Sequence, residues 1–347
     1  MKKTPFIFLC SSILLLWLAG CSKRIYRVAY PTLNDGKYDS EFPYKSSSAE
    51  LEEITRTIKK LTAIAYYKSY VFSEKNPAVL SEIRDDSFKK KTVDTKFYNN
   101  PVIGTATVLL YKDRRVVLLT CAHVINFRDT IITYFKDPEI GLTKYIQSVA
   151  VKEKQSNFVA DFPEHGELEI LAQDRHTDLA LLGQKFENVN PMMFPVFKYP
   201  FGLAKELEWG SFVYMIGFPK GYQMVTKGIV SQPNRDKKGS FIVDALFNKG
   251  FSGGVVLAVR DGVPNFELVG IASSVSADFK FTLNPPKDIG RGGYDPLLPY
   301  KGDIFIRFEK SINYGITFII SSESILKFLR KNQEPLLQKG YDIEPLL

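Results

Sequence analysis

The stretch Asn248-Lys249-Gly250-Phe251-Ser252-Gly253-Gly254 runs directly into the apolar segment from Val255 to Val259. A serine held between glycines at the mouth of a strand can present its hydroxyl to a substrate. The flanking backbone can offer N–H groups to a developing oxyanion. Ser252 is therefore a candidate nucleophile, and its partners in the chain decide the fold.

The order of those partners separates two fold classes. The spelling G-x-S-x-G also fits the nucleophile elbow of α/β-hydrolases, in which the acid and then the histidine follow the serine. The chain has three histidines, His123, His165 and His176, and all of them precede Ser252. The order here is therefore His, Asp, Ser, and the hydrolase alternative is excluded.

Two further stretches supply the histidine and the aspartate. A buried-strand pattern from Val116 to Thr120 leads into Cys121-Ala122-His123, and Asp178 directly precedes the apolar run from Leu179 to Leu182. At these places the sequence resembles trypsin-like serine proteases, especially their HtrA-like branch. The matching motifs are Thr-x-Ala-His at 120–123, Asp-Leu-Ala-Leu-Leu at 178–182 and Gly-x-Ser-Gly-Gly at 250–254.

The resemblance implies an all-β fold of two six-stranded Greek-key barrels, and it implies roles for single residues. Ser252 would attack a peptide or ester carbonyl, His123 would act as its base, and Asp178 would orient His123. Gly250 and Ser252 would supply the backbone N–H groups of the oxyanion hole. The segment Leu268 to Ser273 resembles the strand that pairs with substrate backbone, so Ser273 is a candidate substrate-binding residue.

Two observations keep alternatives open. Asp174 also precedes the apolar run and is a second candidate for the acid, although Asp178 adjoins the strand directly. Phe251 stands where HtrA-like enzymes usually have asparagine, so the oxyanion loop must be held by packing. A non-catalytic surface module that keeps the barrels to bind a protein partner is the alternative to an active endopeptidase.

The resemblance also points to one residue that would set which substrate side chain is accepted. In trypsin-like enzymes the residue six positions before the nucleophile lies at the base of that pocket, which points here to Leu246. An apolar base predicts cleavage after Val, Ala or Leu, because a buried cation would stay unpaired. A bulge could still bring Asp244 into the pocket.

The N-terminus has the pattern of a bacterial lipoprotein. Lys2 and Lys3 precede an apolar core from Phe6 to Ala19, which is typical of a secretory signal at 1–20. Leu18-Ala19-Gly20-Cys21 resembles the lipobox, so we expect a lipid on Cys21 that anchors the chain in the cell envelope, with the outer membrane favoured. An ordinary signal peptide with an incidental cysteine is the alternative.

Charge and composition indicate which classes of partner and cofactor the protein does not need. The formal charge of +8 falls to +6 once Lys2 and Lys3 are removed, and no dense basic run or nucleic-acid motif occurs, so we expect no nucleic-acid partner. Residues with metal-ligand spacing and phosphate-binding loops are also missing, so no metal or other cofactor is expected. Cys121 is expected to be a buried core thiol. The sequence does not define the oligomeric state.

The remaining segments complete the organisation. A flexible tether is expected at 22–47, followed by an amphipathic helix at about 48–67 that packs on the protease domain, or less expectedly binds a partner. Together with Cys21 they form an extension over 21–95; the protease domain spans 96–330, with a short helix from 322 to about 330, and a tail follows at 331–347. The Gly-, Pro- and Asp-rich stretch 275–302 is expected to be a lid or partner-binding loop.

Overall fold

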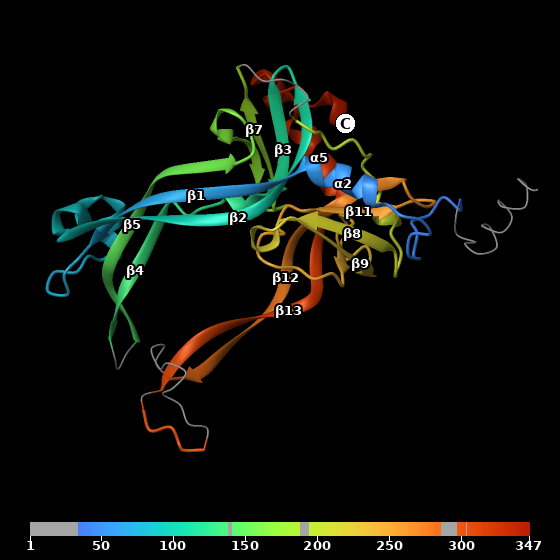
Figure 1. Ribbon diagram of the computed structural model, residues 1–347. Coiled ribbons are helices and arrows are strands. Elements are labelled where there is room, and N and C mark those ends of the chain that lie inside the picture. The colour runs from blue at the N-terminus through green and yellow to red at the C-terminus, as the bar shows by residue number, and fades with distance from the viewer. Residues whose placement is uncertain (1–33, 138–140, 188–193, 286–296, 303) are drawn as a thin grey trace, which may run out of the picture.

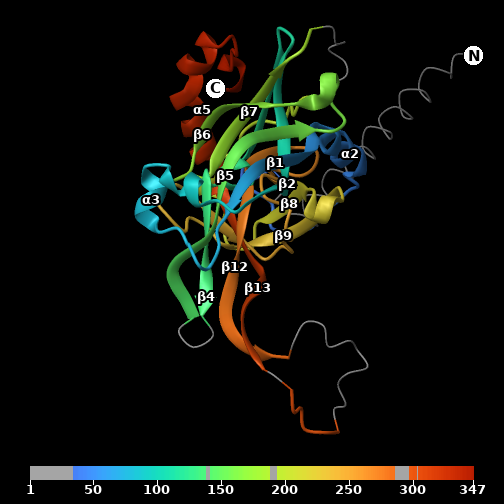
Figure 2. The same ribbon diagram turned by 90° about the vertical axis from the view of Figure 1, so that its left-hand side faces the viewer.

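The computed structural model describes residues 34–137, 141–187, 194–285, 297–302 and 304–347. Its strands form two sheets that lie side by side, with long strand pairs extending from both (Figures 1 and 2). The fold is mostly β, as the sequence predicted, and it is a double-barrel arrangement of the trypsin type. Each half has its own apolar core.

The first sheet contains seven strands in the order β4-β5-β1-β2-β3-β7-β6. These strands are β1 (Ile58–Val71), β2 (Asp94–Lys112), β3 (Arg115–Cys121), β4 (Thr130–Asp137), β5 (Gly141–Val159), β6 (Glu169–Asp174) and β7 (Leu179–Lys185). All neighbouring pairs are antiparallel. The sheet has one strand more than the six expected, and β1 lies inside it between β5 and β2.

Strand β1 corrects the expected helix at 48–67. Helix α2 (Ser48–Thr57) ends at Thr57, and the chain continues as a strand from Ile58. Leu61 and Ala65 fit the helical period, but Leu61, Ala63, Ala65 and Tyr67 fit the two-residue period of a strand equally well. The strand forms because β1 pairs with β2 on one edge and with β5 on the other, which no sequence period reveals.

The second sheet is a closed six-stranded barrel in the order β10-β13-β12-β11-β8-β9. Its strands are β8 (Phe212–Gly217), β9 (Met224–Gln232), β10 (Phe241–Val243), β11 (Val255–Val259), β12 (Phe266–Asn284) and β13 (Phe305–Ser321). This barrel confirms the expected architecture for the second half. Val255 to Val259 is buried at every position, because β11 lies between β8 and β12 inside the barrel wall.

Strands β12 and β13 extend well beyond the barrel as a two-stranded arm (Figure 1). The pairing runs from Gly270 with Ser321 to Asn284 with Phe305. The expected loop at 275–302 is therefore wrong for its first part, since residues 275–284 are strand. Lysine and threonine alternate with aromatic and aliphatic residues there, and this two-residue period favours a strand.

Helix α5 (Ser322–Gln338) joins the two halves. It begins directly after β13 at Ser322, as the sequence predicted, and the Ser321 hydroxyl accepts the Ser324 N–H at 3.3 Å. Its apolar face, with Ile325 and Leu329, packs into the core of the first sheet. The helix continues past the expected end near residue 330 and includes Pro335.

The C-terminal tail and two short helices complete the first half. Tyr341 and Ile343 are buried in the core of the first sheet, so the end of the tail packs on the domain. Helix α3 (Leu80–Arg84) lies between β1 and β2 in the chain, and helix α4 (Ala122–Ile125) follows β3. A separate small core lies at the far end of the first sheet: Phe72, Ala78, Phe88, Ile146 and Val149.

The segment before α2 is docked on the second barrel. Tyr38 is buried, its hydroxyl donates to Glu267 at 2.6 Å, and the backbone of Asp39 bonds Val259 and Phe212. The expected flexibility of residues 22–47 is therefore wrong for this part. Ile54 of α2 lies in an apolar cluster with residues of β8 and β11, so the expected packing of the helix on the domain is confirmed. Within the described ranges, no helix is long and apolar enough to cross a bilayer.

Candidate active site

Three side chains from distant parts of the chain meet at the junction of the two sheets. His123 Nδ1 lies 2.8 Å from Asp178 Oδ2, and His123 Nε2 lies 2.8 Å from Ser252 Oγ. With the Nδ1 proton donated to the carboxylate, Nε2 is free to accept the serine proton. The structure therefore brings together the histidine, aspartate and serine that the motifs singled out.

Backbone contacts fix His123 against Asp178. Strand β3 ends at Cys121, and the next two residues bond to Asp178: Ala122 N–H donates to its carbonyl at 3.0 Å, and His123 N–H donates to Oδ1 at 2.9 Å. Asp178 has φ of 58° in the turn between β6 and β7, a conformation that aspartate tolerates better than most residues. The carboxylate thus holds both the backbone and the ring of His123.

Asp174 has a different role from Asp178. Its Oδ1 accepts the backbone N–H groups of His176 at 2.9 Å and Thr177 at 3.3 Å. These bonds close the turn that delivers Asp178, so Asp174 supports the site without contacting His123. His176 and His165 are both exposed, as expected.

The electrostatic environment keeps Asp178 ionised. Burial raises the pKa of its carboxyl, but hydrogen bonds from His123 and Ser273 outweigh this, and the pKa lies below its ordinary value. The Ser273 hydroxyl donates to Oδ2 at 2.7 Å. An ionised Asp178 can stabilise the cationic form of His123 that arises when Ser252 loses its proton.

Ser273 thus has a second function that the sequence reading missed. It was singled out for pairing with substrate backbone, yet its side chain contacts Asp178, and its carbonyl lies 3.2 Å from Ser252 Oγ. Only the position of β12 beside β3 brings this residue to the site. In the sequence, only the position of the Ser273 hydroxyl at the end of an apolar run could have indicated its contact with Asp178.

The loop before Ser252 has the shape of an anion-binding site. Gly250 has φ of 107°, and a Cβ there would lie 2.3 Å from the Phe218 carbonyl oxygen, so only glycine fits. Phe251 N–H donates to Asn248, whereas the N–H groups of Gly250 and Ser252 have no acceptor within the described ranges. Two backbone donors on either side of Phe251 are therefore available to an oxyanion.

Phe251 holds this loop by packing. Its ring is 1% exposed, lies 6.0 Å from the Phe247 ring, and abuts Gly217, where a Cβ would come within 2.8 Å of it. A side chain at residue 217 would push Phe251 out of the core. The apolar residue before the nucleophile is thus accommodated inside the second barrel, with the loop in an open form.

Thr105 is a positioning residue that sequence reasoning did not find. This buried threonine on β2 donates its hydroxyl to the Gly250 carbonyl at 2.8 Å and accepts the Phe218 N–H at 2.9 Å. Its backbone N–H also donates to the Ser252 carbonyl at 2.8 Å. The first sheet therefore fixes the oxyanion loop of the second barrel through one residue. The sequence around Thr105, a threonine after Gly104 in a strand, contains no pattern that indicates a contact with the oxyanion loop.

Gly253 lets the two sheets approach closely. It has φ of 87°, and a Cβ would lie 2.1 Å from the Thr105 carbonyl oxygen. The Thr120 hydroxyl donates to that same carbonyl at 2.7 Å. The glycine after the nucleophile is thus required by contact between the nucleophile loop and strands β2 and β3.

Cys121 is a buried free thiol, as predicted. Burial raises its pKa well above the ordinary value, so the thiol stays protonated and is not a nucleophile. Its sulfur, a His123 nitrogen and an Asp178 oxygen lie within 4.8 Å of one another. Both ring nitrogens of His123 already have partners in Asp178 and Ser252, so these three residues fit a proton-transfer site better than a metal site.

The residues proposed for substrate selection are arranged differently from expectation. The Leu246 side chain is 60% exposed, so it does not form the floor of a closed pocket. Asp244 is exposed, and its Oδ1 accepts the Ile229 N–H of β9 at 2.7 Å. The predicted preference for Val, Ala or Leu stays a prediction, because neither side chain closes a cavity beside Ser252.

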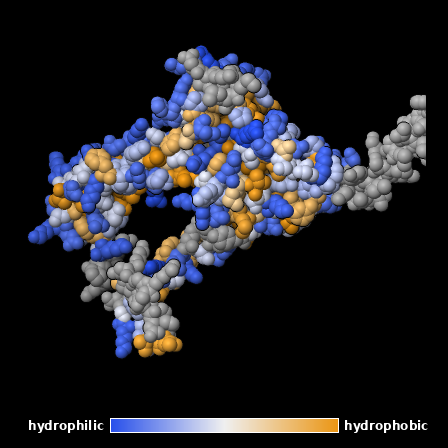
Figure 3. All heavy atoms as spheres, in the orientation of Figure 1, coloured by the Kyte–Doolittle hydropathy of each residue, from blue (hydrophilic) through white to orange (hydrophobic). Residues whose placement is uncertain are grey.

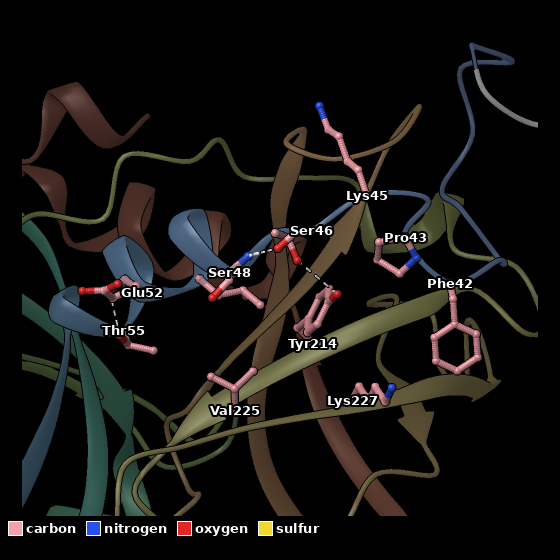
Figure 4. Close-up of a pocket in the computed structure, with 12 residues that line it drawn as sticks. Phe42, Pro43, Lys45, Ser46, Ser48, Glu52, Thr55, Tyr214, Val225 and Lys227 are labelled. Atoms are coloured by element: carbon pink, nitrogen blue, oxygen red, sulfur yellow. Dashed lines mark hydrogen bonds between the residues drawn. The ribbon is translucent and has the colours of Figure 1, made fainter. Parts of the chain in front are cut away.

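A pocket of about 640 Å³ lies apart from these residues (Figure 4). It is formed by the segment before α2, by α2 itself and by β8 and β9. Lys227 lies over the ring of Phe42, and the Tyr214 hydroxyl lies 3.4 Å from the Ser47 hydroxyl. None of its lining residues belongs to the His123, Asp178 and Ser252 cluster.

Residues 104–271 match the family model of the trypsin-like peptidase domain. This range contains the three clustered residues and the oxyanion loop, and together with the double-barrel architecture it supports a chymotrypsin-fold protease. No curated protein matches the chain significantly. The match leaves out β1, Ser273 and the arm of β12 and β13.

Proposed function

We propose that this protein is a serine endopeptidase of the bacterial cell envelope, anchored by a lipid on Cys21. The observation that supports the catalytic part is the hydrogen-bonded series Asp178, His123 and Ser252 beside two available backbone N–H groups. A nucleophile, a base, an orienting carboxylate and oxyanion donors are the groups that acyl transfer needs.

The first half of the reaction forms an acyl-enzyme. Ser252 Oγ attacks the carbonyl carbon while its proton passes to His123 Nε2, and the carbonyl oxygen becomes an oxyanion. The N–H groups of Gly250 and Ser252 bind that oxygen; losing one such donor costs on the order of 3 kcal/mol of transition-state stabilisation. His123 then donates its proton to the departing amine, and the peptide bond breaks.

The second half repeats the proton transfers with water. His123 takes a proton from a water molecule, whose oxygen attacks the acyl carbon, and the same two N–H groups bind the second oxyanion. Collapse returns the proton to Ser252 Oγ and releases the carboxylic acid. Apart from the substrate and this water, each group that takes part is a residue of the chain.

A fluorophosphonate reagent tests this proposal, because it reacts rapidly only with an activated serine. The wild-type protein should be labelled, Ser252→Ala should not be, and His123→Ala should be nearly inert. His176→Ala is the matched control, since His176 is exposed and lies outside the cluster. Labelling of His123→Ala at the wild-type rate would refute the proposal.

The activity should also depend on pH. His123 has to be neutral to accept the serine proton, so turnover should rise from acidic toward neutral pH. A profile that stays flat from pH 5.5 to about 8, with chemistry limiting the rate, would contradict the role given to His123.

The lipid anchor is tested separately, since residues 1–33 lie outside the described ranges. Metabolic labelling with a fatty-acid analogue should mark the wild-type chain and fail on Cys21→Ala. The native protein should partition with membranes, and an outer-membrane location is our expectation. Incorporation that persists in Cys21→Ala would refute the lipid anchor without touching the catalytic proposal.

The alternative function is a non-catalytic surface module that keeps the barrels to bind a protein partner, with the oxyanion loop collapsed around Phe251. Phe251 is instead packed against Phe247 and Gly217, and Gly250 keeps an open conformation. This packing supports the endopeptidase, and the fluorophosphonate experiment decides between the two functions.

A further inference from the structure

Strand β12 has two halves with different surroundings. From Phe266 to Ile271 it pairs with β11 on one edge, and from Gly270 onward it pairs with β13 on the other. Beyond Ala272 the edge that faced β11 pairs with no strand of the described ranges, over residues 273–284. Figures 1 and 2 show this part of β12 leaving the barrel with β13.

One face of the arm is apolar and exposed. The register places Phe281 opposite Phe308 and Leu283 opposite Ile306, and these four side chains are between 62% and 75% exposed. The Phe308 ring lies 5.3 Å from the rings of both Phe279 and Phe281. Figure 3 shows hydrophobic residues on the surface of the upper part of the arm, next to the barrel.

The other face of the arm is polar. Lys280 lies opposite Glu309, and Thr282 lies opposite Arg307. A two-stranded ribbon gains little from burial when its apolar face is open to water, and such exposed apolar surface marks an interaction site. The arm is therefore built to present one apolar face and one strand edge to a partner.

The unpaired edge begins at the nucleophile. The Ser273 carbonyl lies 3.2 Å from Ser252 Oγ, so a chain held in the site meets β12 at its first unpaired residue. His123 lies on the side of the first sheet and must face the leaving amine. The acyl half of a substrate then lies on the other side, over the second barrel, where β12 begins to extend.

We propose that the arm is an extended binding surface for the acyl half of the substrate. A segment of polypeptide with apolar residues at alternate positions pairs with β12 along residues 273–284 and packs those side chains beside Phe281 and Leu283. This inference rests on the proposed endopeptidase function and names its substrate class. Twelve residues of strand span about 40 Å, so about ten substrate residues can pair.

The geometry excludes compact substrates from this mode. Addition of a strand to an edge requires a chain whose own backbone N–H and C=O groups are free, which holds for unfolded or extended segments. Alternating apolar and polar residues are the pattern of strands from antiparallel sheets with one buried face, and such strands have free backbone groups when they are unfolded. The arm therefore selects unfolded β-rich polypeptide before the scissile bond.

The test compares cleavage of a short and a long peptide by the full-length protein. Both share the residues next to the scissile bond, and the long one adds about ten residues on the acyl side with Val and Thr alternating. A third peptide shifts the alternation by one residue, which moves every Val to the opposite face. We expect kcat/KM to be about tenfold higher for the long peptide than for the short or the shifted one.

Substitutions on the two faces of the arm test whether its apolar face binds the substrate. The double substitution Phe281→Ser with Leu283→Ser should bring the long-to-short ratio of kcat/KM close to one. The matched control, Lys280→Ser with Thr282→Ser on the opposite face, should keep the wild-type ratio. Equal ratios for the two double variants, or no length effect in wild type, would overturn the inference.

Binding to Ser252→Ala separates this inference from the proposed function. If wild type cleaves nothing but fluorescence anisotropy shows that Ser252→Ala binds the long peptide more tightly than the short one, the arm is a binding surface and the endopeptidase proposal fails. If wild type cleaves the short and the long peptide equally well, the endopeptidase proposal is supported and the arm is not a binding surface for the substrate.

Two other occupants of the apolar face are also measured. Sedimentation that shows an oligomer for wild type and a monomer for the Phe281→Ser, Leu283→Ser variant would assign the face to a second copy. The Cys21→Ala protein is also mixed with phosphatidylethanolamine vesicles. If it binds them, and if adding Phe281→Ser and Leu283→Ser abolishes the binding, the apolar face would be assigned to lipid. Either result would overturn the substrate assignment.

Discussion

The two halves of β12 show how one strand can be structural at one end and functional at the other. Residues 266–272 are almost all buried and close the second barrel, whereas residues 273–284 are partly or fully exposed. The change occurs at Ser273, the residue that contacts both Ser252 and Asp178. Conservative substitutions at Ser273, at its neighbours in the site and in residues 266–272 should therefore lower activity or stability strongly. Even large truncations in residues 274–284 should have little effect on the stability of the fold.

The largest effect is expected at the junction itself. Asp178→Asn keeps the shape of the side chain but removes the charge and the acceptor that set the His123 tautomer, so kcat should fall by about 10⁴-fold. Asp174→Asn, four residues earlier, is the matched control and should keep most of the activity, since Asp174 bonds only the turn. Steady-state kinetics on one peptide distinguishes them, and equal losses would contradict the assignment of the acid.

The next effect concerns the buried half of β12. Phe266 is 1% exposed and packs with the rings of Tyr199 and Tyr214. Phe266→Ala should lower the free energy of unfolding by about 3–5 kcal/mol, because it removes buried apolar surface and leaves a cavity. Chemical denaturation measures this. A loss below 1 kcal/mol would mean that this half of β12 is not the structural part we take it to be.

Thr105 tests how the first sheet holds the oxyanion loop. Thr105→Val keeps the volume but leaves the Gly250 carbonyl and the Phe218 N–H without their partner, so kcat/KM should fall by about 10- to 100-fold. Thr107→Val on the same strand is the control, because the buried Thr107 hydroxyl has no hydrogen-bond partner within the described ranges. Thr107→Val should leave activity unchanged and stability equal or higher. Similar kinetic losses in both variants would point to β2 packing instead.

Ser273 tests the boundary between the two halves. Ser273→Ala removes one hydrogen bond to Asp178, so kcat should fall by about tenfold. The same change raises the pKa of Asp178 toward its ordinary value. A lowered carboxyl pKa stabilises the fold above the unfolded-state pKa, and this contribution is lost as the pH falls through the folded-state pKa.

The stability difference between wild type and Ser273→Ala should therefore be present at pH 7 and shrink below about pH 4. Unfolding curves at several pH values measure it. A difference that stays constant down to pH 2 would show that the Ser273 hydroxyl acts through packing and leaves the Asp178 carboxylate unaffected.

These expectations show which parts of the molecule short motifs determine. His123, Asp178 and Ser252 were found because each adjoins a buried strand, and Asp174 lies four residues before Asp178. Thr105 and the Asp178 contact of Ser273 were not found, because each acts across the junction between sheets. No local pattern records that β2 lies against the nucleophile loop.

The fold shows the same division. The closed six-stranded barrel of the second half was predicted correctly, because the motifs around Ser252 resemble those of trypsin-like proteases. The lengths of β12 and β13, 19 and 17 residues, were not predicted. The helix expected at 58–67 was wrong, since Leu61 and Ala65 satisfy both periods and only pairing of β1 with β2 and β5 decides between them. The loop expected at 275–284 was wrong because an exposed strand lacks the apolar continuity of a buried one.

The smallest effect completes the comparison on β12. Phe281 is as large as Phe266 but 75% exposed, so truncating it removes little surface from contact with protein. Phe281→Ala should change the free energy of unfolding by no more than about 0.5 kcal/mol. Measured beside Phe266→Ala, it compares the same substitution at two positions of one strand. A loss above about 2 kcal/mol would mean that Phe281 is buried in the native protein in solution, and the arm would then belong to the folded core.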